Sequence, residues 1–131
     1  MSKEKLRILI VDDDWEDVNV ISEALALHSP GIEIITAENG RMALEYLNTA
    51  STSLSLVILD LNMPELDGKN TLAKIQDDEQ LSKVPVVILT TSSNQTDRKY
   101  FEKLNVKMLT KPWDNDQIKE IVQQLLYMAS N

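Results

Sequence analysis

The sequence predicts an α/β fold in which helices cover both faces of a parallel sheet. Five short runs are rich in Val, Ile and Leu and lack polar alternation, as is typical of strands buried on both faces. Each run is followed by apolar residues at helical spacing. Strand and helix therefore alternate five times, a (βα)5 pattern that favours parallel strands joined by crossover helices. A chain of 131 residues suits one domain spanning 1–131.

The first half of the chain supplies two of these strand–helix units and the third strand. The predicted strands are Ile8–Val11, the weaker Ile32–Ile35, and Leu56–Leu59. Helical spacing follows the first at Val18, Ile21 and Leu25, and follows the second at Ala43, Leu44 and Leu47. Asn39 can cap the second helix, since its side chain can accept from free backbone N–H groups.

The second half repeats the pattern. Leu72 and Ile75 follow the third strand, Val86–Leu89 is the fourth strand, and the weaker Val106–Leu109 is the fifth. Pro85 opens the fourth strand, where a missing N–H is tolerated. The next two helices carry Tyr100, Phe101 and Leu104, and then Ile118, Ile121, Val122, Leu125 and Leu126, behind a potential Asp114 cap.

Composition excludes several classes of function. The chain has no Cys, which excludes disulfides, thiolate metal sites and a catalytic Cys. A net charge of −8 has the wrong sign for a protein that binds nucleic acid. Its apolar runs are too short to span a bilayer, and residues 1–11 lack the pattern of a signal peptide. We therefore expect a cytoplasmic protein with no membrane or nucleic-acid partner.

Polar side chains gather where the predicted strands end. The first strand ends in Asp12, Asp13 and Asp14, the third in Asp60, the fourth in Thr90, Thr91, Ser92 and Ser93, and the fifth in Lys111 and Pro112. The carboxyl ends of parallel strands meet at one edge of a sheet, where ligands bind. Clustered carboxylates there suit Mg²⁺ or Mn²⁺. Lys111 and Thr90 would complement a phosphoryl group, and an Asp carboxylate can be its acceptor.

The segments ILIVDDD, LVILDLNMPELDG, VVILTTSSN and MLTKPWD carry a family resemblance. Taken together and in this order, they resemble the receiver domain of bacterial two-component response regulators over the whole chain. The resemblance implies a flavodoxin-like, three-layer fold with sheet order 2-1-3-4-5. Since the sequence ends soon after the last predicted helix, we expect a stand-alone regulator that has no output domain and is not an enzyme. Its expected partners are a sensor histidine kinase or histidine phosphotransfer domain and a downstream protein.

The same resemblance implies roles for individual residues. Asp60 would be the phosphoacceptor, and the metal would be held by Asp13, by Asp12 through water, by Asp60 and by the Asn62 carbonyl. Lys111 and Thr90 would contact the phosphoryl group. Pro64, Gly68 and Pro112 would shape the turns, with a cis Lys111–Pro112 bond. Met108 stands where the family usually has an aromatic switch residue, and Leu104-Asn105-Val106 stands where Gly-Ala is usual.

Several alternatives remain open at this stage. Asp14, Glu16 and Asp17 fit an ordinary acidic helix start, and Trp15 and Trp113 fit either an interface or loop packing. A phosphatase with an aspartyl-phosphate intermediate would need an acid at the position of Asn62. A flavin-binding module would place its hydroxyl-rich loop after the first strand, not the fourth. Basic residues from Arg98 to Lys111 and acidic ones from Asp114 to Glu120 predict a homodimer through the fourth helix, fifth strand and last helix.

Overall fold

The computed structural model describes residues 5–50, 53–63, 65–91 and 94–130, and it contains five parallel strands in the order β2-β1-β3-β4-β5. The strands are β1 Arg7–Val11, β2 Glu33–Ala37, β3 Leu56–Leu59, β4 Val86–Thr90 and β5 Lys107–Thr110. The helices are α1 Trp15–His28, α2 Gly40–Ala50, α3 Gly68–Asp77, α4 Gln95–Lys103 and α5 Asn115–Ser130, with a 3₁₀ turn η2 at Leu81–Lys83. The predicted flavodoxin-like fold and strand order are confirmed.

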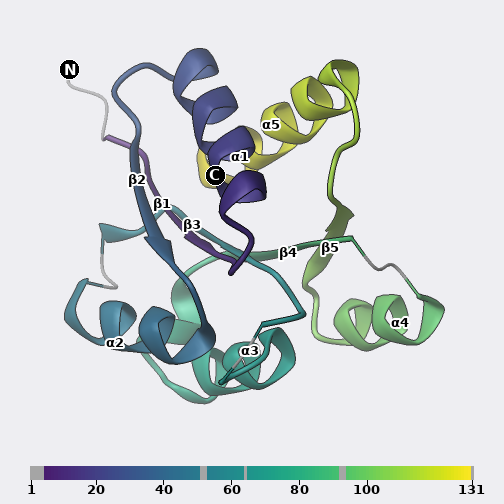
Figure 1. Ribbon diagram of the computed structural model, residues 1–131. Helices are drawn as coiled ribbons and strands as arrows, with labels where there is room; N and C mark the ends of the chain where they lie inside the picture. Colours follow the sequence, from purple (N-terminus) through teal and green to yellow (C-terminus); the bar gives the residue numbers. More distant parts are fainter. Residues whose placement is uncertain (1–4, 51–52, 64, 92–93, 131) are drawn as a thin grey trace.

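Helices cover both faces of the sheet (Figure 1). Helices α1 and α5 lie on one face, and α2, α3 and α4 lie on the other. Side chains of β1 alternate between the two layers, so Ile8 packs with the α1–α5 cluster and Leu9 with the cluster beneath α2, α3 and α4. The side chains on both faces are buried, which explains why the central strands β1, β3 and β4 are uninterrupted apolar runs in the sequence.

The two weakly patterned strands are the edges of the sheet. β2 and β5 each pair with one neighbour only, and their burial is patchy compared with β1, β3 and β4. In each case the observed strand begins and ends one or two residues later than the apolar run predicts. An edge strand keeps polar residues on its exposed side, so apolar content alone locates it less accurately.

Side-chain caps fix the starts of the helices near the carboxyl edge. Asn39 accepts a hydrogen bond from the Met42 N–H at 2.8 Å, and Asp114 accepts from the Gln117 N–H at 2.9 Å, as predicted. Asn94 caps α4 by accepting from the Asp97 N–H at 2.8 Å.

Within the described part of the chain, no helix is both long enough and apolar enough to cross a membrane.

The topology places a crevice between β1 and β3. From β1 the chain passes to β2 on one side, and the sheet then continues through β3 on the other. This reversal is the switch point at which open α/β sheets bind ligands. The residues that follow β1 and β3 therefore lie at the natural binding position of the fold.

Candidate functional site

Backbone pairing brings the acidic residues after β1 and β3 together. The Asp60 N–H donates to the Val11 carbonyl at 3.0 Å, so the two strands end side by side. Asp12 and Asp60 are buried and Asp13 is exposed. Carboxylate oxygens of these three residues lie within 4.8 Å of one another. The predicted acidic cluster is present, and it is built on rigid strand ends.

The three consecutive aspartates after β1 have different tasks. Asp12 accepts a hydrogen bond from the Asp14 N–H at 2.9 Å, which turns the chain out of the strand. Asp14 caps α1 and accepts from the backbone N–H groups of Glu16 and Asp17. Of the three, only Asp12 and Asp13 belong to the cluster. Asp14 is the helix cap, in agreement with the alternative that it marks an ordinary acidic start of a helix.

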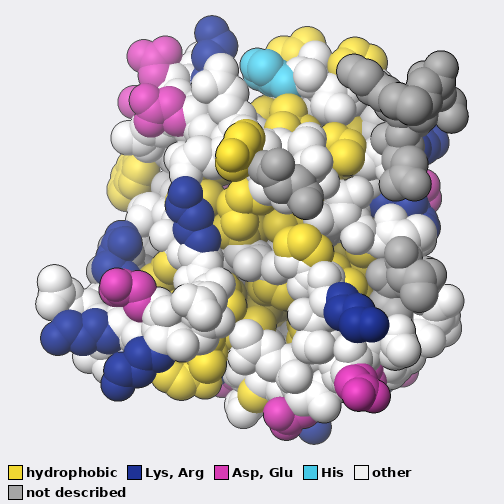
Figure 2. Space-filling model, turned by 180° about the vertical axis from the view of Figure 1, so that it is seen from behind, with side chains coloured by type: hydrophobic (Ala, Val, Ile, Leu, Met, Phe, Trp, Pro, Cys, Tyr) yellow, Lys and Arg dark blue, Asp and Glu magenta, His cyan; other side chains and the backbone are white. Residues whose placement is uncertain are grey.

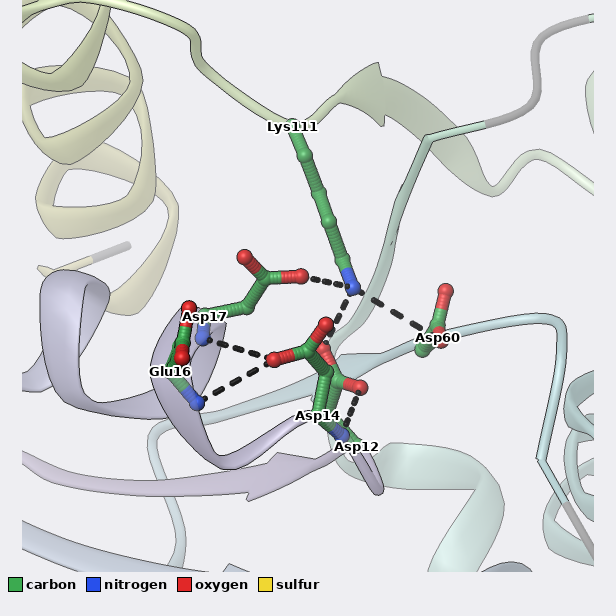
Figure 3. A network of polar contacts seen from close by, with 6 residues as sticks. All are labelled: Asp12, Asp14, Glu16, Asp17, Asp60 and Lys111. Atoms are coloured by element: carbon green, nitrogen blue, oxygen red, sulfur yellow. Dashed lines mark hydrogen bonds and ion pairs between the residues drawn. The ribbon is translucent and has the colours of Figure 1, made fainter.

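Lys111 places a buried ammonium among these carboxylates (Figure 3). Its Nζ lies 2.7 Å from Asp12 Oδ2, 2.8 Å from Asp17 Oδ2 and 3.7 Å from Asp60 Oδ2. Burial lowers the pKa of Lys111, but the hydrogen bonds to Asp12 and Asp17 outweigh burial and raise this pKa above its ordinary value. Lys111 therefore stays protonated at any physiological pH.

The predicted cis bond between Lys111 and Pro112 is wrong, because the described chain contains no cis peptide. The trans bond is also the ordinary state, favoured by about 0.5–1 kcal/mol at X–Pro. Figure 3 shows why no sharp turn is needed: the long lysine side chain itself extends from the end of β5 to the carboxylates.

Asp17 is a member of the site that the sequence did not reveal. It lies in the first turn of α1, where acidic residues are common because they interact favourably with the helix dipole. Its carboxylate nevertheless accepts a hydrogen bond from Lys111, 94 positions away in the sequence. One signal was available. Asp17 precedes the buried Ile21 by one helical turn and adjoins the buried Val18, so it lies at the end of the inward stripe of α1.

The cluster carries unbalanced negative charge. The cluster of Asp12, Asp13 and Asp60, together with the nearby Asp17, supplies four carboxylates, and among the described side chains one ammonium, that of Lys111, contacts them. Burial, followed by the charge of Asp12, raises the pKa of Asp60 to about 6, although Lys111 opposes the shift. Burial also raises the pKa of Asp12 in spite of its bond to Lys111. This excess favours binding of a cation.

The donor set fits a hard divalent ion. Carboxylate oxygens from Asp12, Asp13 and Asp60 converge, and oxygen is the ligand that Mg²⁺ and Mn²⁺ prefer. Asn62 follows Asp60 by two residues in an exposed loop, and its carbonyl stays a predicted ligand. The group is consistent with divalent metal binding.

Thr90 contributes a buried hydroxyl at the end of β4. The hydroxyl lies close enough to Asp60 to favour the ionised carboxylate, yet no described group makes a hydrogen bond of good geometry to its Oγ1. An unpaired buried hydroxyl costs about 1–3 kcal/mol. A phosphoryl oxygen at Asp60 would supply the missing partner, so the observation fits the role predicted for Thr90.

The turn after Asp60 is packed too tightly for a side chain. A Cβ on Gly68 would lie 2.3 Å from the Asp60 carbonyl oxygen and 2.7 Å from Leu61 Cα. The Gly68 N–H also donates to the Leu61 carbonyl at 3.0 Å, and Asp67 caps α3. The lack of a side chain at Gly68 therefore lets α3 begin against the backbone of Asp60, while its role in the turn that holds the Asn62 carbonyl stays a prediction. Pro64 lies outside the described residues.

Met108 is half-buried on the edge strand β5. It pairs in register with Ile88 and packs against the cluster beneath α4 that includes Phe101. Asn105, in the segment Leu104-Asn105-Val106 that stands where Gly-Ala was expected, has a φ of 59°. Asn tolerates this left-handed conformation better than most residues, which explains how the turn before β5 forms without Gly.

Comparison with known sequences identifies relatives of the chain. A family model described as a response regulator receiver domain matches residues 8–123. The chain is 36% identical over 95 residues to the response regulator Rcp1 of Synechocystis sp. (strain ATCC 27184 / PCC 6803 / Kazusa), covering 69% of this chain and 65% of that protein. It is 36% identical over 126 residues to the transcriptional regulatory protein CpxR homolog of Haemophilus influenzae, covering 95% and 52%. It thus spans about half to two thirds of the length of these two curated relatives.

Solved structures of related proteins have the same fold. The phosphorylated cyanobacterial phytochrome response regulator RcpA superposes with a TM-score of 0.83 at 34% identity, covering 92% of this chain and 91% of that one. The Mn²⁺-bound form of Rcp1 gives 0.80 at 32%, with coverage of 92% and 91%. The bacteriophytochrome response regulator AtBRR gives 0.75 at 30%, with coverage of 94% of both chains.

Proposed function

The chain belongs to the response regulator receiver family, and on this premise we propose that it is a regulator in a two-component phosphorelay. Asp60 accepts a phosphoryl group from a sensor histidine kinase or a histidine phosphotransfer domain. The observation that carries the proposal is the position of Asp60, buried at the switch point of the sheet between other carboxylates and Lys111. An Asp that merely ends a strand would be expected to be exposed to solvent, whereas Asp60 is buried beside other charged groups.

Asp60 is the nucleophile of the proposed transfer. A carboxylate oxygen attacks phosphorus, the P–N bond to the donor histidine breaks, and the imidazole leaves with that electron pair. With a pKa of about 6, Asp60 is mostly ionised at neutral pH and can attack. Lys111 and the Thr90 hydroxyl complement the charge of the bound phosphoryl group. Asp12, Asp13, Asp60 and the Asn62 carbonyl would hold Mg²⁺, which neutralises charge on the phosphoryl oxygens when bound.

The output surface we propose comprises α4, β5 and α5. Figure 2 shows Lys and Arg side chains gathered at the lower left, where α4 lies, and acidic side chains at the upper left, toward the start of α5. Arg98, Lys99 and Lys103 are exposed on α4, and Asp116 and Glu120 are exposed on α5. A two-fold axis can set each basic group against the acidic group of a second copy. Exposed pairs are worth only about 0–1 kcal/mol each, so this dimer is weak without phosphorylation.

The two alternative functions receive no support from the site. An aspartyl-phosphate phosphatase would need an acid two residues after Asp60, and Asn62 cannot transfer a proton. The hypothesis of a flavin-binding module depends on the hydroxyl-rich loop after β4, and residues 92–93 of that loop lie outside the described residues. The chain is therefore proposed to act as a signalling protein and not as an enzyme. Its similarity to Rcp1 and RcpA makes a phytochrome-type histidine kinase the first donor to test.

Intact-mass measurement tests the proposal directly. The protein is incubated with acetyl phosphate and Mg²⁺, and we expect the added mass of one phosphoryl group, which hydroxylamine removes. Asp60→Asn should abolish the adduct, and a chelator should prevent it in the parent protein. Glu23→Gln, which removes an exposed charge far along α1, serves as the matched control and should label normally. An adduct that persists in Asp60→Asn would show that Asp60 is not the acceptor.

A further inference from the structure

Asp17 is bound to the functional lysine but does not belong to the group of converging carboxylates. Its Oδ2 lies 2.8 Å from Lys111 Nζ, a distance expected for a strong charged hydrogen bond. The described group of possible metal-holding residues comprises Asp12, Asp13 and Asp60, without Asp17. Together with burial, the charge of the Asp17 carboxylate raises the pKa of Asp12, but its hydrogen bond is to Lys111, and this bond is the one that can hold the lysine away from Asp60.

Lys111 is bound toward α1 more closely than toward Asp60. An ammonium has three N–H donors, and two of them have acceptors at 2.7 and 2.8 Å in Asp12 and Asp17. The distance to Asp60 Oδ2 is 3.7 Å, which is too long for a hydrogen bond. In the unmodified protein the lysine is therefore held beside the phosphoacceptor by its other two partners.

There is room for Lys111 to change partner. A pocket of about 130 Å³ opens beside the cluster and is lined by Asp12, Asp17, Asp60 and Lys111, with Pro112 and Trp113 at the adjoining loop. A phosphoryl group at Asp60 adds about 1.5–2 negative charges and three acceptor oxygens. The Lys111 ammonium can then move toward Asp60 by rotation of its flexible stem, provided that it leaves Asp17.

We propose that Asp17 is a positioning residue that competes with the phosphorylated Asp60 for Lys111 and thereby weakens the phosphorylated state. The inference rests on the proposed function. Asp17 retains the lysine on the α1 side, and every phosphorylation event must release it. Because the Asp17 side chain is 37% exposed, the contact is partly screened by water and its effect is moderate.

Beryllofluoride, an analogue of the phosphoryl group, measures this competition as a binding equilibrium. With Mg²⁺ present, Asp17→Asn should bind beryllofluoride about two- to fivefold more tightly than the parent, as expected for loss of a partly exposed ion pair. Asp17→Ser is a second neutral variant in case the first folds poorly. Asp17→Glu keeps the charge and can still reach Lys111, so it should restore affinity close to that of the parent.

Glu16→Gln is the matched control, since it removes the same charge from the same turn of α1 at an exposed side chain. It should leave beryllofluoride affinity within about 1.5-fold of the parent, because charge at the surface is screened. An equal gain in Glu16→Gln, or an unchanged or weaker affinity in both neutral Asp17 variants, would overturn the competition. If the parent itself binds no beryllofluoride, the proposed function fails and the inference fails with it.

Discussion

Replacing Asp60 by Asn should stabilise the metal-free protein at neutral pH. Burial and the nearby Asp12 raise the pKa of Asp60 from 3.8 to about 6, so the folded protein holds this carboxylate in an unfavourable ionised state. Each pKa unit corresponds to about 1.36 kcal/mol, and the shift thus sets an upper bound of about 3 kcal/mol. Asn loses the attraction of Lys111 at 3.7 Å, and we therefore expect a gain of about 1–2 kcal/mol in the free energy of unfolding.

The sign of the pH dependence follows from the same shift. Between about pH 4 and pH 6, the folded state binds more protons at Asp60 than the unfolded state does, so this group makes stability fall as pH rises. Above about pH 6 the full destabilisation by ionised Asp60 is present, and below about pH 4, where Asp60 is protonated in both states, it is absent. The advantage of Asp60→Asn over the parent should accordingly be full at pH 7.5 and should vanish near pH 4.

Urea unfolding followed by far-UV circular dichroism gives the comparison. Trp113 is 88% exposed, which makes its fluorescence a poor probe of unfolding. For a chain of this size, each kcal/mol gained in the free energy of unfolding should raise the melting temperature by about 3–4 °C. Glu23→Gln, an exposed charge change on α1, should shift stability by less than about 0.5 kcal/mol. Lower or equal stability of Asp60→Asn at pH 7.5, or an equal gain at pH 4, would refute the reasoning.

Four further outcomes are expected. Mg²⁺ should raise the melting temperature of the parent, and Asp13→Ala should lose most of that rise if Asp13 is a ligand. Gly68→Ala should cost about 1–3 kcal/mol in urea unfolding and slow labelling of Asp60, because the new Cβ would displace the backbone there. Thr90→Val should leave the stability of the unmodified protein equal or higher, yet weaken beryllofluoride binding, since no described group makes a hydrogen bond of good geometry to the Thr90 hydroxyl. Sedimentation at low salt should show beryllofluoride-promoted dimers that Lys99→Glu weakens; an unchanged monomer would exclude the α4–β5–α5 interface.

The fold was predictable because its strong signals are local. Buried central strands must be apolar on both sides, so Leu56–Leu59 was located at its observed bounds from the sequence alone. Caps such as Asn39 and Asp114 act within three residues and were likewise predictable. The edge strands were displaced by one or two residues, since exposure on one side dilutes the apolar pattern.

The site was only partly predictable, for a related reason. Strand ends meet at one edge by topology, which places Asp12, Asp60 and Lys111 together once the strands are known. Asp17 comes instead from the side of a helix, and its contact depends on how α1 packs beside the chain that follows β5. Helical spacing indicates only that Asp17 lies at the end of the inward stripe of α1, and it does not predict the contact with Lys111. The expected cis isomer of the Lys111–Pro112 bond came from the family resemblance and not from the residues, whose ordinary preference is trans.

Three features of the unmodified site would change when a divalent ion and a phosphoryl group bind. Asp60 is ionised at neutral pH although burial raises its pKa, and Thr90 has a buried hydroxyl with no well-placed described partner. Lys111 is held more closely by Asp12 and Asp17 than by Asp60. A divalent ion would relieve the crowding of carboxylates, and a phosphoryl group would offer acceptors to both the hydroxyl and the ammonium. Phosphorylation of Asp60 would therefore change the partners of Thr90, at the end of β4, and of Lys111, directly after β5, together. Because β5 lies beside α4 and carries Met108, that change can reach the proposed output surface through backbone packing without an aromatic switch residue.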